Sequence, residues 1–109
     1  ADRYTEAYFR SFDRRRKIVF EHLHDLPGVS MRLAESGFLS WINVSELGSG
    51  SEVALYLNRE ALVAVNAGDS YGHEGKDYIR VVHGVMHEAE LEEAARRMRA
   101  ALLRLAKTK

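Results

Sequence analysis

The feature that most constrains the fold is a long amphipathic segment at residues 87–107. Its apolar side chains recur every three or four residues and so form one stripe of a helix. The stripe consists of Leu91, Ala94, Ala95, Met98, Leu102 and Leu105. Glutamates gather at the start of the segment, and Arg104 and Lys107 lie near its end, as the helix dipole prefers. Such a helix must bury its stripe, so it predicts one layer of a packed domain.

The remaining elements follow from periodicity and turn residues. Helical spacing predicts a helix over residues 4–26, which Pro27-Gly28 ends. Residues 51–59 predict a shorter helix with Ser51 as its N-cap. Runs rich in β-branched and aromatic residues predict strands at 29–35, 38–44, 61–67 and 78–84.

The expected fold class is α/β (α+β), with the element order α-β-β-α-β-β-α. Strands that occur in pairs between helices predict a small, mostly antiparallel sheet of three to four strands with helices packed on one face. A chain of 109 residues is long enough for one core and too short for two, so we expect a single domain.

Composition excludes several functional classes. Lysine plus arginine balance aspartate plus glutamate at 16 each, which argues against a nucleic-acid partner. The absence of cysteine excludes thiolate metal sites and cysteine nucleophiles and fits a reducing compartment. No apolar run is long enough to span a membrane, so we expect a cytoplasmic protein. The chain begins at Ala1 and not at a methionine, which suggests processing or a piece of a longer protein.

Arg80 is the one residue with a clear binding chemistry. Strand residues alternate faces, so Arg80 shares a face with Tyr78 and Val82. A guanidinium on a rigid strand suits a carboxylate or a phosphate, although many strand arginines only face solvent. The segment 68–75 before this strand has three glycines, which predict special backbone angles or close approach to another group. Its glycine spacing does not match a phosphate-binding fingerprint.

Other catalytic arrangements are incomplete. His83 and His87 are four residues apart and Glu88 follows, but the junction between a strand and a helix separates the histidines and no third spaced ligand exists. No G-x-S-x-G motif is present. Three acids lie within or next to the glycine-rich segment and are interpreted as exposed loop residues: Asp69, Glu74 and Asp77. The chain therefore carries part of a site and no complete catalytic apparatus.

Residues 37–105 resemble the C-terminal small domain of pyridoxal-phosphate (PLP)-dependent aminotransferases of fold type I, the aspartate aminotransferase superfamily. Residues 37–48 look like the first small-domain strand and the loop after it, closest to the cystathionine β-lyase-like branch. Residues 65–72 look like the family's glycine loop, with Ala67 in place of a proline. Tyr78-Ile79-Arg80-Val81 looks like the family's arginine strand.

The resemblance implies that residues 1–109 are one domain of a larger enzyme. Residues 1–26 would be the end of the interdomain helix plus the first small-domain helix. Arg80 would bind the substrate α-carboxylate. The family's cofactor lysine and other cofactor-binding residues lie in the large domain, so we expect no catalytic, cofactor-binding or metal-binding residue in this chain, which alone would be inactive.

The parent enzyme is expected to be a PLP-dependent aminotransferase, a homodimeric transferase of amino-acid metabolism. Its partners would be an amino acid, a 2-oxo acid and the missing large domain, which holds the PLP. Two alternatives stay open at this point. One is a PLP-dependent C–S β-lyase domain, and the other is a free-standing α+β module that binds a small anionic ligand.

Overall fold

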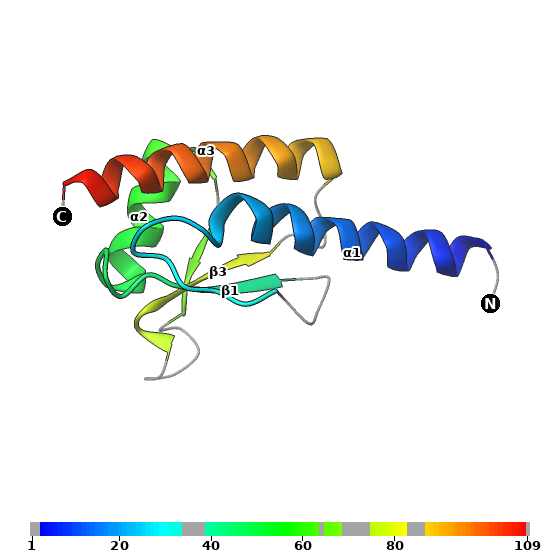
Figure 1. The fold of residues 1–109 in the computed structure, drawn as a ribbon, viewed down its shortest axis with the longest axis horizontal. Helices are drawn as coiled ribbons and strands as arrows, with labels where there is room; N and C mark the ends of the chain where they lie inside the picture. The colour runs from blue at the N-terminus through cyan, green and yellow to red at the C-terminus, as the bar shows by residue number, and fades with distance from the viewer. Residues whose placement is uncertain (1–2, 34–38, 64, 69–74, 83–86, 109) are drawn as a thin grey trace.

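The computed structural model describes residues 3–33, 39–63, 65–68, 75–82 and 87–108, with side chains described from Asp13 onward. In this part of the chain, helices pack on one side of a three-stranded sheet (Figure 1). The elements in chain order are α1 (Arg3–Leu23), β1 (Leu39–Asn43), α2 (Gly50–Glu60), β2 (Asn66–Ala67), β3 (Tyr78–Val82) and α3 (Glu88–Lys107). The predicted fold class is thereby confirmed.

The sheet is antiparallel throughout, and β3 is its central strand, in the order β1-β3-β2. On one side β3 pairs with β1, with Ile79 opposite Ile42. On the other side it pairs with β2, with Ile79 opposite Ala67. Ile42 and Ile79 are fully buried and Val81 nearly so, which means that this face of the sheet meets the helices.

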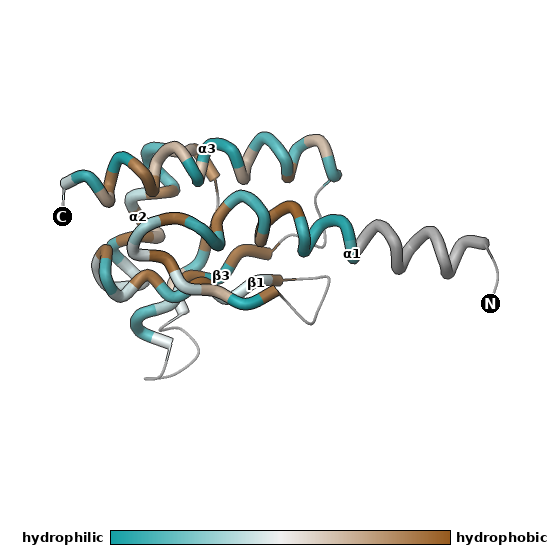
Figure 2. The backbone as a smooth tube through the Cα atoms, viewed as in Figure 1, coloured by the Kyte–Doolittle hydropathy of each residue, from teal (hydrophilic) through white to brown (hydrophobic). Residues whose placement is uncertain are grey.

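The apolar stripe predicted for the last helix forms one wall of the core. Its buried residues are Leu91, Ala94, Ala95, Met98, Ala101 and Leu102, and the predicted Leu105 is partly buried against them. Val19 and Leu23 of α1 and Leu26 after it are buried in the same cluster. Figure 2 shows apolar and polar residues alternating along α3 and along the coloured part of α1, as helices with one buried side require.

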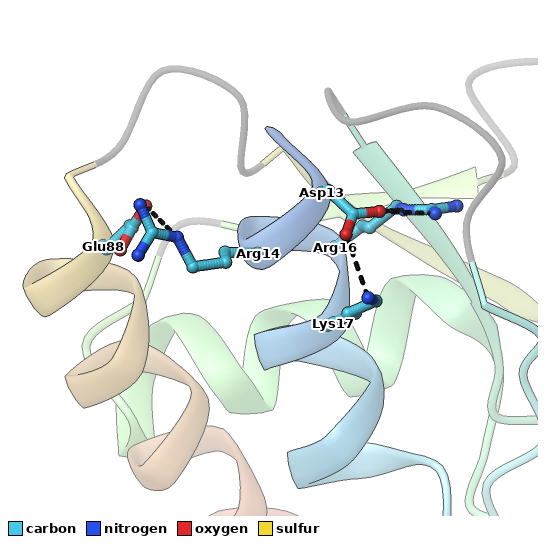
Figure 3. A network of polar contacts seen from close by, with 5 residues as sticks. All are labelled: Asp13, Arg14, Arg16, Lys17 and Glu88. Atoms are coloured by element: carbon cyan, nitrogen blue, oxygen red, sulfur yellow. Dashed lines mark hydrogen bonds and ion pairs between the residues drawn. The ribbon is translucent and has the colours of Figure 1, made fainter. Parts of the chain in front are cut away.

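The second half of α1 runs side by side with α3 and in the same direction (Figure 1). Polar contacts link the two helices there. Arg14 Nε binds Glu88 Oε1 at 3.2 Å near the start of α3 (Figure 3). His22 Nε2 lies 3.0 Å from Glu92 Oε1. Arg99 Nη1 donates to the His22 carbonyl and to Asp25 Oδ1, each at 2.7 Å. Arg99 thus ties α3 to the last turn of α1, where backbone carbonyls need donors.

The basic run Arg14–Lys17 does not form a uniform positive patch. Asp13 binds both Arg16 and Lys17, at 2.6 and 2.9 Å, while Arg14 reaches across to Glu88 (Figure 3). The run is therefore largely balanced by neighbouring carboxylates, as expected for the solvated side of a helix.

The Asp25–Arg99 contact makes a pH-dependent contribution to stability. The hydrogen bond from Arg99 holds the pKa of Asp25 below its ordinary value of 3.8. A lowered folded-state pKa adds stability above pH 3.8 that is lost as the pH falls through the folded pKa. Asp25→Asn should therefore lower Tm slightly near neutral pH, and the difference from the native chain should shrink below pH 3.8. Thermal melts from about pH 2 to 7 check this; a difference independent of pH would contradict it.

Helix α2 begins two residues earlier than predicted, because its N-cap is Ser49 and not Ser51. The Ser49 hydroxyl accepts from the Glu52 backbone N–H at 3.2 Å, and Glu52 Oε1 accepts from the Ser49 N–H at 3.4 Å. This reciprocal pair is a capping box, which needs the S-x-x-E spacing that Ser49 has. Ser51 lies inside the first turn of the helix.

Two predicted strands are wrong in extent, so the order is α-β-α-β-β-α. Of residues 29–35, only Ser30 joins the sheet, as a single bridge to Asn43; residues 34 and 35 lie outside the described part. The strand predicted at 61–67 shortens to Asn66–Ala67. The chain leaves α2 through Leu62, which has a φ of 56°, and the Val65 N–H donates to Asn58 Oδ1 at 3.0 Å. The Asn58 side chain therefore accepts the Val65 N–H, which a longer strand would use for pairing with a neighbouring strand.

Candidate functional site

Arg80 lies at the centre of the sheet. It is the middle residue of β3, and its register partners are Trp41 of β1 and Asn66 of β2. A residue between two paired strands has its backbone fixed on both sides, so the direction in which its side chain leaves the sheet is fixed as well. The side chain is half-buried, and its Nε atom is shielded from solvent.

The guanidinium belongs to the face of the sheet that the helices leave open. Its neighbours Ile79 and Val81 are 0% and 2% exposed and face the helices, while Tyr78, Arg80 and Val82 are half-buried on the opposite face. The predicted alternation is therefore confirmed. Asn66 and Trp41, which flank Arg80 on this face, are both exposed, Trp41 by 40%.

An aromatic pair borders Arg80. The ring centroids of Trp41 and Tyr78 are 6.3 Å apart, and the ring planes are tilted by 57°. A Cβ added to Gly68 would lie 3.0 Å from Trp41 Cζ3 and 3.0 Å from Tyr78 Cβ. The indole thus lies against bare backbone at Gly68. Trp41 therefore lies on the open face of the sheet, outside the core that the helices cover.

The predicted close approach at the glycine-rich segment is confirmed at its two ends. A Cβ on Gly75 would lie 2.1 Å from the Gly68 carbonyl oxygen, and one on Gly68 would lie 2.5 Å from the Gly75 oxygen. The two backbones therefore touch where the segment leaves the sheet, and neither position has room for a side chain. We call this contact the Gly68–Gly75 neck. Residues 69–74 lie outside the described part.

Helix α2 fixes the backbone that leads into β3. The Gly50 N–H donates to the Lys76 carbonyl at 2.7 Å, and the Val44 N–H donates to the Asp77 carbonyl at 2.8 Å. A Cβ on Gly50 would lie 2.1 Å from the Tyr78 carbonyl oxygen. The first turn of α2 therefore packs directly on the strand that carries Arg80.

The other candidate residues do not assemble into a second site. His87 is the exposed N-cap position of α3, and Glu88 is bound by Arg14. Asp77 is partly buried in the turn before β3. The predicted candidates Asp69, Glu74 and His83 lie outside the described residues. Within the described ranges, no group of three His, Asp or Glu side chains could hold a metal ion, and no helix is long and apolar enough to cross a membrane.

Sequence reasoning missed the neighbours of Arg80. Trp41 and Asn66 are 39 and 14 positions away from Arg80 in the chain, and only the strand register brings them beside it. No local signal in the sequence specifies that register. The polar Asn66 within an otherwise apolar run, Ala61–Ala67, was the available hint.

Comparison with known proteins gives a consistent answer. No protein-family model matches the chain. An aspartate aminotransferase of Pyrococcus horikoshii is 32% identical over 99 residues, which are 90% of this chain and 25% of that protein. The crystal structure of an aromatic aminotransferase from Pyrococcus horikoshii superposes with a TM-score of 0.80 at 30% identity, over 89% of this chain and 26% of that one.

A PLP-bound aminotransferase-like structure from Clostridium difficile matches 91% of this chain and 26% of its own, with a TM-score of 0.79 and 27% identity. The chain thus spans about a quarter of the length of the relatives that it matches, and the matched part is their C-terminal quarter. The fold, the sequence identity and the C-terminal location of the match in the relatives all agree with the resemblance that the arginine strand suggested. The chain therefore resembles, over about nine-tenths of its length, the C-terminal part of fold type I aminotransferases of the aspartate aminotransferase superfamily.

Proposed function

We propose that this domain binds the α-carboxylate of an amino-acid substrate through Arg80, as part of a PLP-dependent aminotransferase. The observation that carries the proposal is the place of Arg80 at the centre of the sheet, on the face without helices, in a chain with aminotransferase relatives. Two parallel N–H donors of one guanidinium match the two oxygens of a carboxylate. Both substrates of a transaminase, an amino acid and a 2-oxo acid, carry such a carboxylate.

The fixed backbone of Arg80 suits this role. A substrate held at its carboxylate by a planar fork can no longer rotate freely about that end, which orients the bond to be broken. A lysine at this position would keep the charge and lose the two-point contact. Arg80 is therefore a binding and orienting residue, and the proton transfers belong to groups elsewhere in the protein.

The described residues do not fit the cofactor itself. PLP enzymes hold their cofactor through a lysine. The described lysines are Lys17, Lys76 and Lys107. Lys17 is bound to Asp13, Lys107 ends α3, and Lys76 is exposed in the turn before β3. None of them lies on the open sheet face beside Arg80. We therefore assign PLP to the large domain of a longer, homodimeric protein.

The 109-residue chain by itself tests whether PLP is bound outside this domain. Incubated with PLP and then with borohydride, it should show no saturable adduct on one particular lysine by peptide mass spectrometry. The longer protein should show one on a lysine outside residues 1–109, and it should convert an amino acid to a 2-oxo acid while it aminates a second 2-oxo acid. A saturable adduct on Lys17, Lys76 or Lys107 would contradict the proposal, and release of ammonia in place of amino transfer would contradict transamination.

A further inference from the structure

The Trp41 side chain crosses the open face of the sheet. Trp41 belongs to β1, and Gly68 directly follows β2, so the central strand β3 lies between them. Two strand spacings amount to roughly 10 Å. The Trp41 side chain reaches across most of this width, because its Cζ3 atom lies 3.0 Å from the Cβ position of Gly68. Trp41 is in register with Arg80, and Gly68 lies against Tyr78, so the ring crosses β3 between Tyr78 and Arg80.

The ring is held at both ends. Tyr78 lies beside it in a tilted aromatic contact. Its far edge lies against Gly68, whose backbone is in turn pressed against Gly75 at the Gly68–Gly75 neck. The neck leaves no space into which Gly68 could retreat. One side of Arg80 is therefore bordered by a large, rigid, apolar group, while the exposed Asn66 borders the other side.

Such a border acts on a guanidinium in two ways. An arginine side chain loses rotamer entropy when it binds a ligand, and a fixed neighbouring ring removes some of its conformations before the ligand arrives. An aromatic ring also displaces water, which strengthens the attraction between the guanidinium and a carboxylate. Because its flat faces attract cations, a tryptophan suits this position better than an aliphatic residue of similar size.

We propose that Trp41 is a positioning residue for Arg80, and this inference rests on the proposed function. The Gly68–Gly75 neck holds the indole across β3, and the indole directs the guanidinium toward the substrate carboxylate. Removal of the ring leaves the charge of Arg80 in place but lets its guanidinium adopt more orientations, so substrate binding becomes weaker. In the longer protein, Trp41→Ala should raise KM for the amino acid about tenfold while kcat changes less than about twofold.

A double-mutant cycle in the longer protein tests the coupling of the two residues. Kinetics are measured for the native protein, Arg80→Ala, Trp41→Ala and the double variant. If Trp41 acts through Arg80, Trp41→Ala should lower kcat/KM about tenfold when Arg80 is present. In the Arg80→Ala background, the same substitution should lower kcat/KM less than about twofold. Trp41→Phe keeps a ring beside Tyr78 but does not reach Gly68, so its kcat/KM should lie between those of the native protein and Trp41→Ala. This variant provides the test if Trp41→Ala does not fold.

Leu39→Ala is the matched control, because Leu39 lies on the same strand and the same face but opposite Val82. It should leave KM unchanged within about twofold. If Trp41→Ala lowers kcat/KM by the same factor with and without Arg80, the positioning role is wrong while the proposed function stands. If Arg80→Ala itself leaves kcat/KM unchanged, the proposed function fails.

Discussion

Arg80→Ala is expected to lower kcat/KM of the longer protein for its amino-acid substrate by roughly 30- to 4,000-fold. The range corresponds to about 2–5 kcal/mol for the loss of one partner of a shielded, hydrogen-bonded charge pair. The effect should be large because the guanidinium is half-buried between two paired strands and has a shielded Nε atom. Steady-state kinetics with varied amino acid and 2-oxo acid measure it for both half-reactions, since each substrate carries the same carboxylate.

Arg80→Lys separates charge from geometry. The ammonium group keeps the positive charge but makes no planar two-point contact, so it should recover only a small part of the loss. Arg96→Ala is the matched control: Arg96 is exposed on α3 and bound to Glu93 on the same helix, and its loss should leave kcat/KM unchanged. Native activity in Arg80→Ala would show that another group binds the carboxylate.

Gly50→Ala is expected to destabilise the 109-residue chain by about 2–3 kcal/mol, a Tm decrease of roughly 10 °C. The added Cβ would lie 2.1 Å from the Tyr78 carbonyl oxygen and 3.1 Å from that of Lys76. Both contacts are with backbone that is held by the Gly50–Lys76 and Val44–Asp77 hydrogen bonds, so it cannot move away. Alanine gains up to about 1 kcal/mol over glycine in helix propensity, which is too little to offset the clash.

Leu55→Ala provides the comparison on the same helix. Leu55 is 64% exposed, so its truncation should change the free energy of unfolding by less than about 0.5 kcal/mol. Chemical denaturation followed by circular dichroism measures both variants. Equal stability of Gly50→Ala and the native chain would mean that α2 does not pack on β3 as closely as described.

The long helices were predictable because their signals are local. The stripe at 87–107 and the break at Pro27-Gly28 use spacings of a few residues, and the ends of α1 and α3 lie within three residues of the predicted bounds. The strand at 61–67 failed for the opposite reason. Its apolar composition favours a strand, but the side chain of Asn58 accepts the Val65 N–H, and Leu62 turns the chain away. Tertiary contacts of this kind override local propensity.

The candidate site was predictable in chemistry and not in its surroundings. The face of Arg80 follows from strand alternation, which is a local rule. Its place in the central strand, with Trp41 on one side, depends on pairing between strands that lie far apart in the sequence. The glycines at 68 and 75 indicated a close approach, but not that they approach each other or that an indole lies against them.

The central position of β3 also determines when the sheet can form. The strands β1 and β2 precede β3 in the chain, yet in the described part each pairs with β3 and not with the other. During synthesis neither strand can pair with β3 until residue 82 has left the ribosome, although Asn43 of β1 can already form its single bridge to Ser30. The arginine proposed to hold the substrate therefore arrives on the segment that completes the sheet. A chain that stops before Tyr78 has no strand ladder among these elements, so folding of the sheet and assembly of the site are one event.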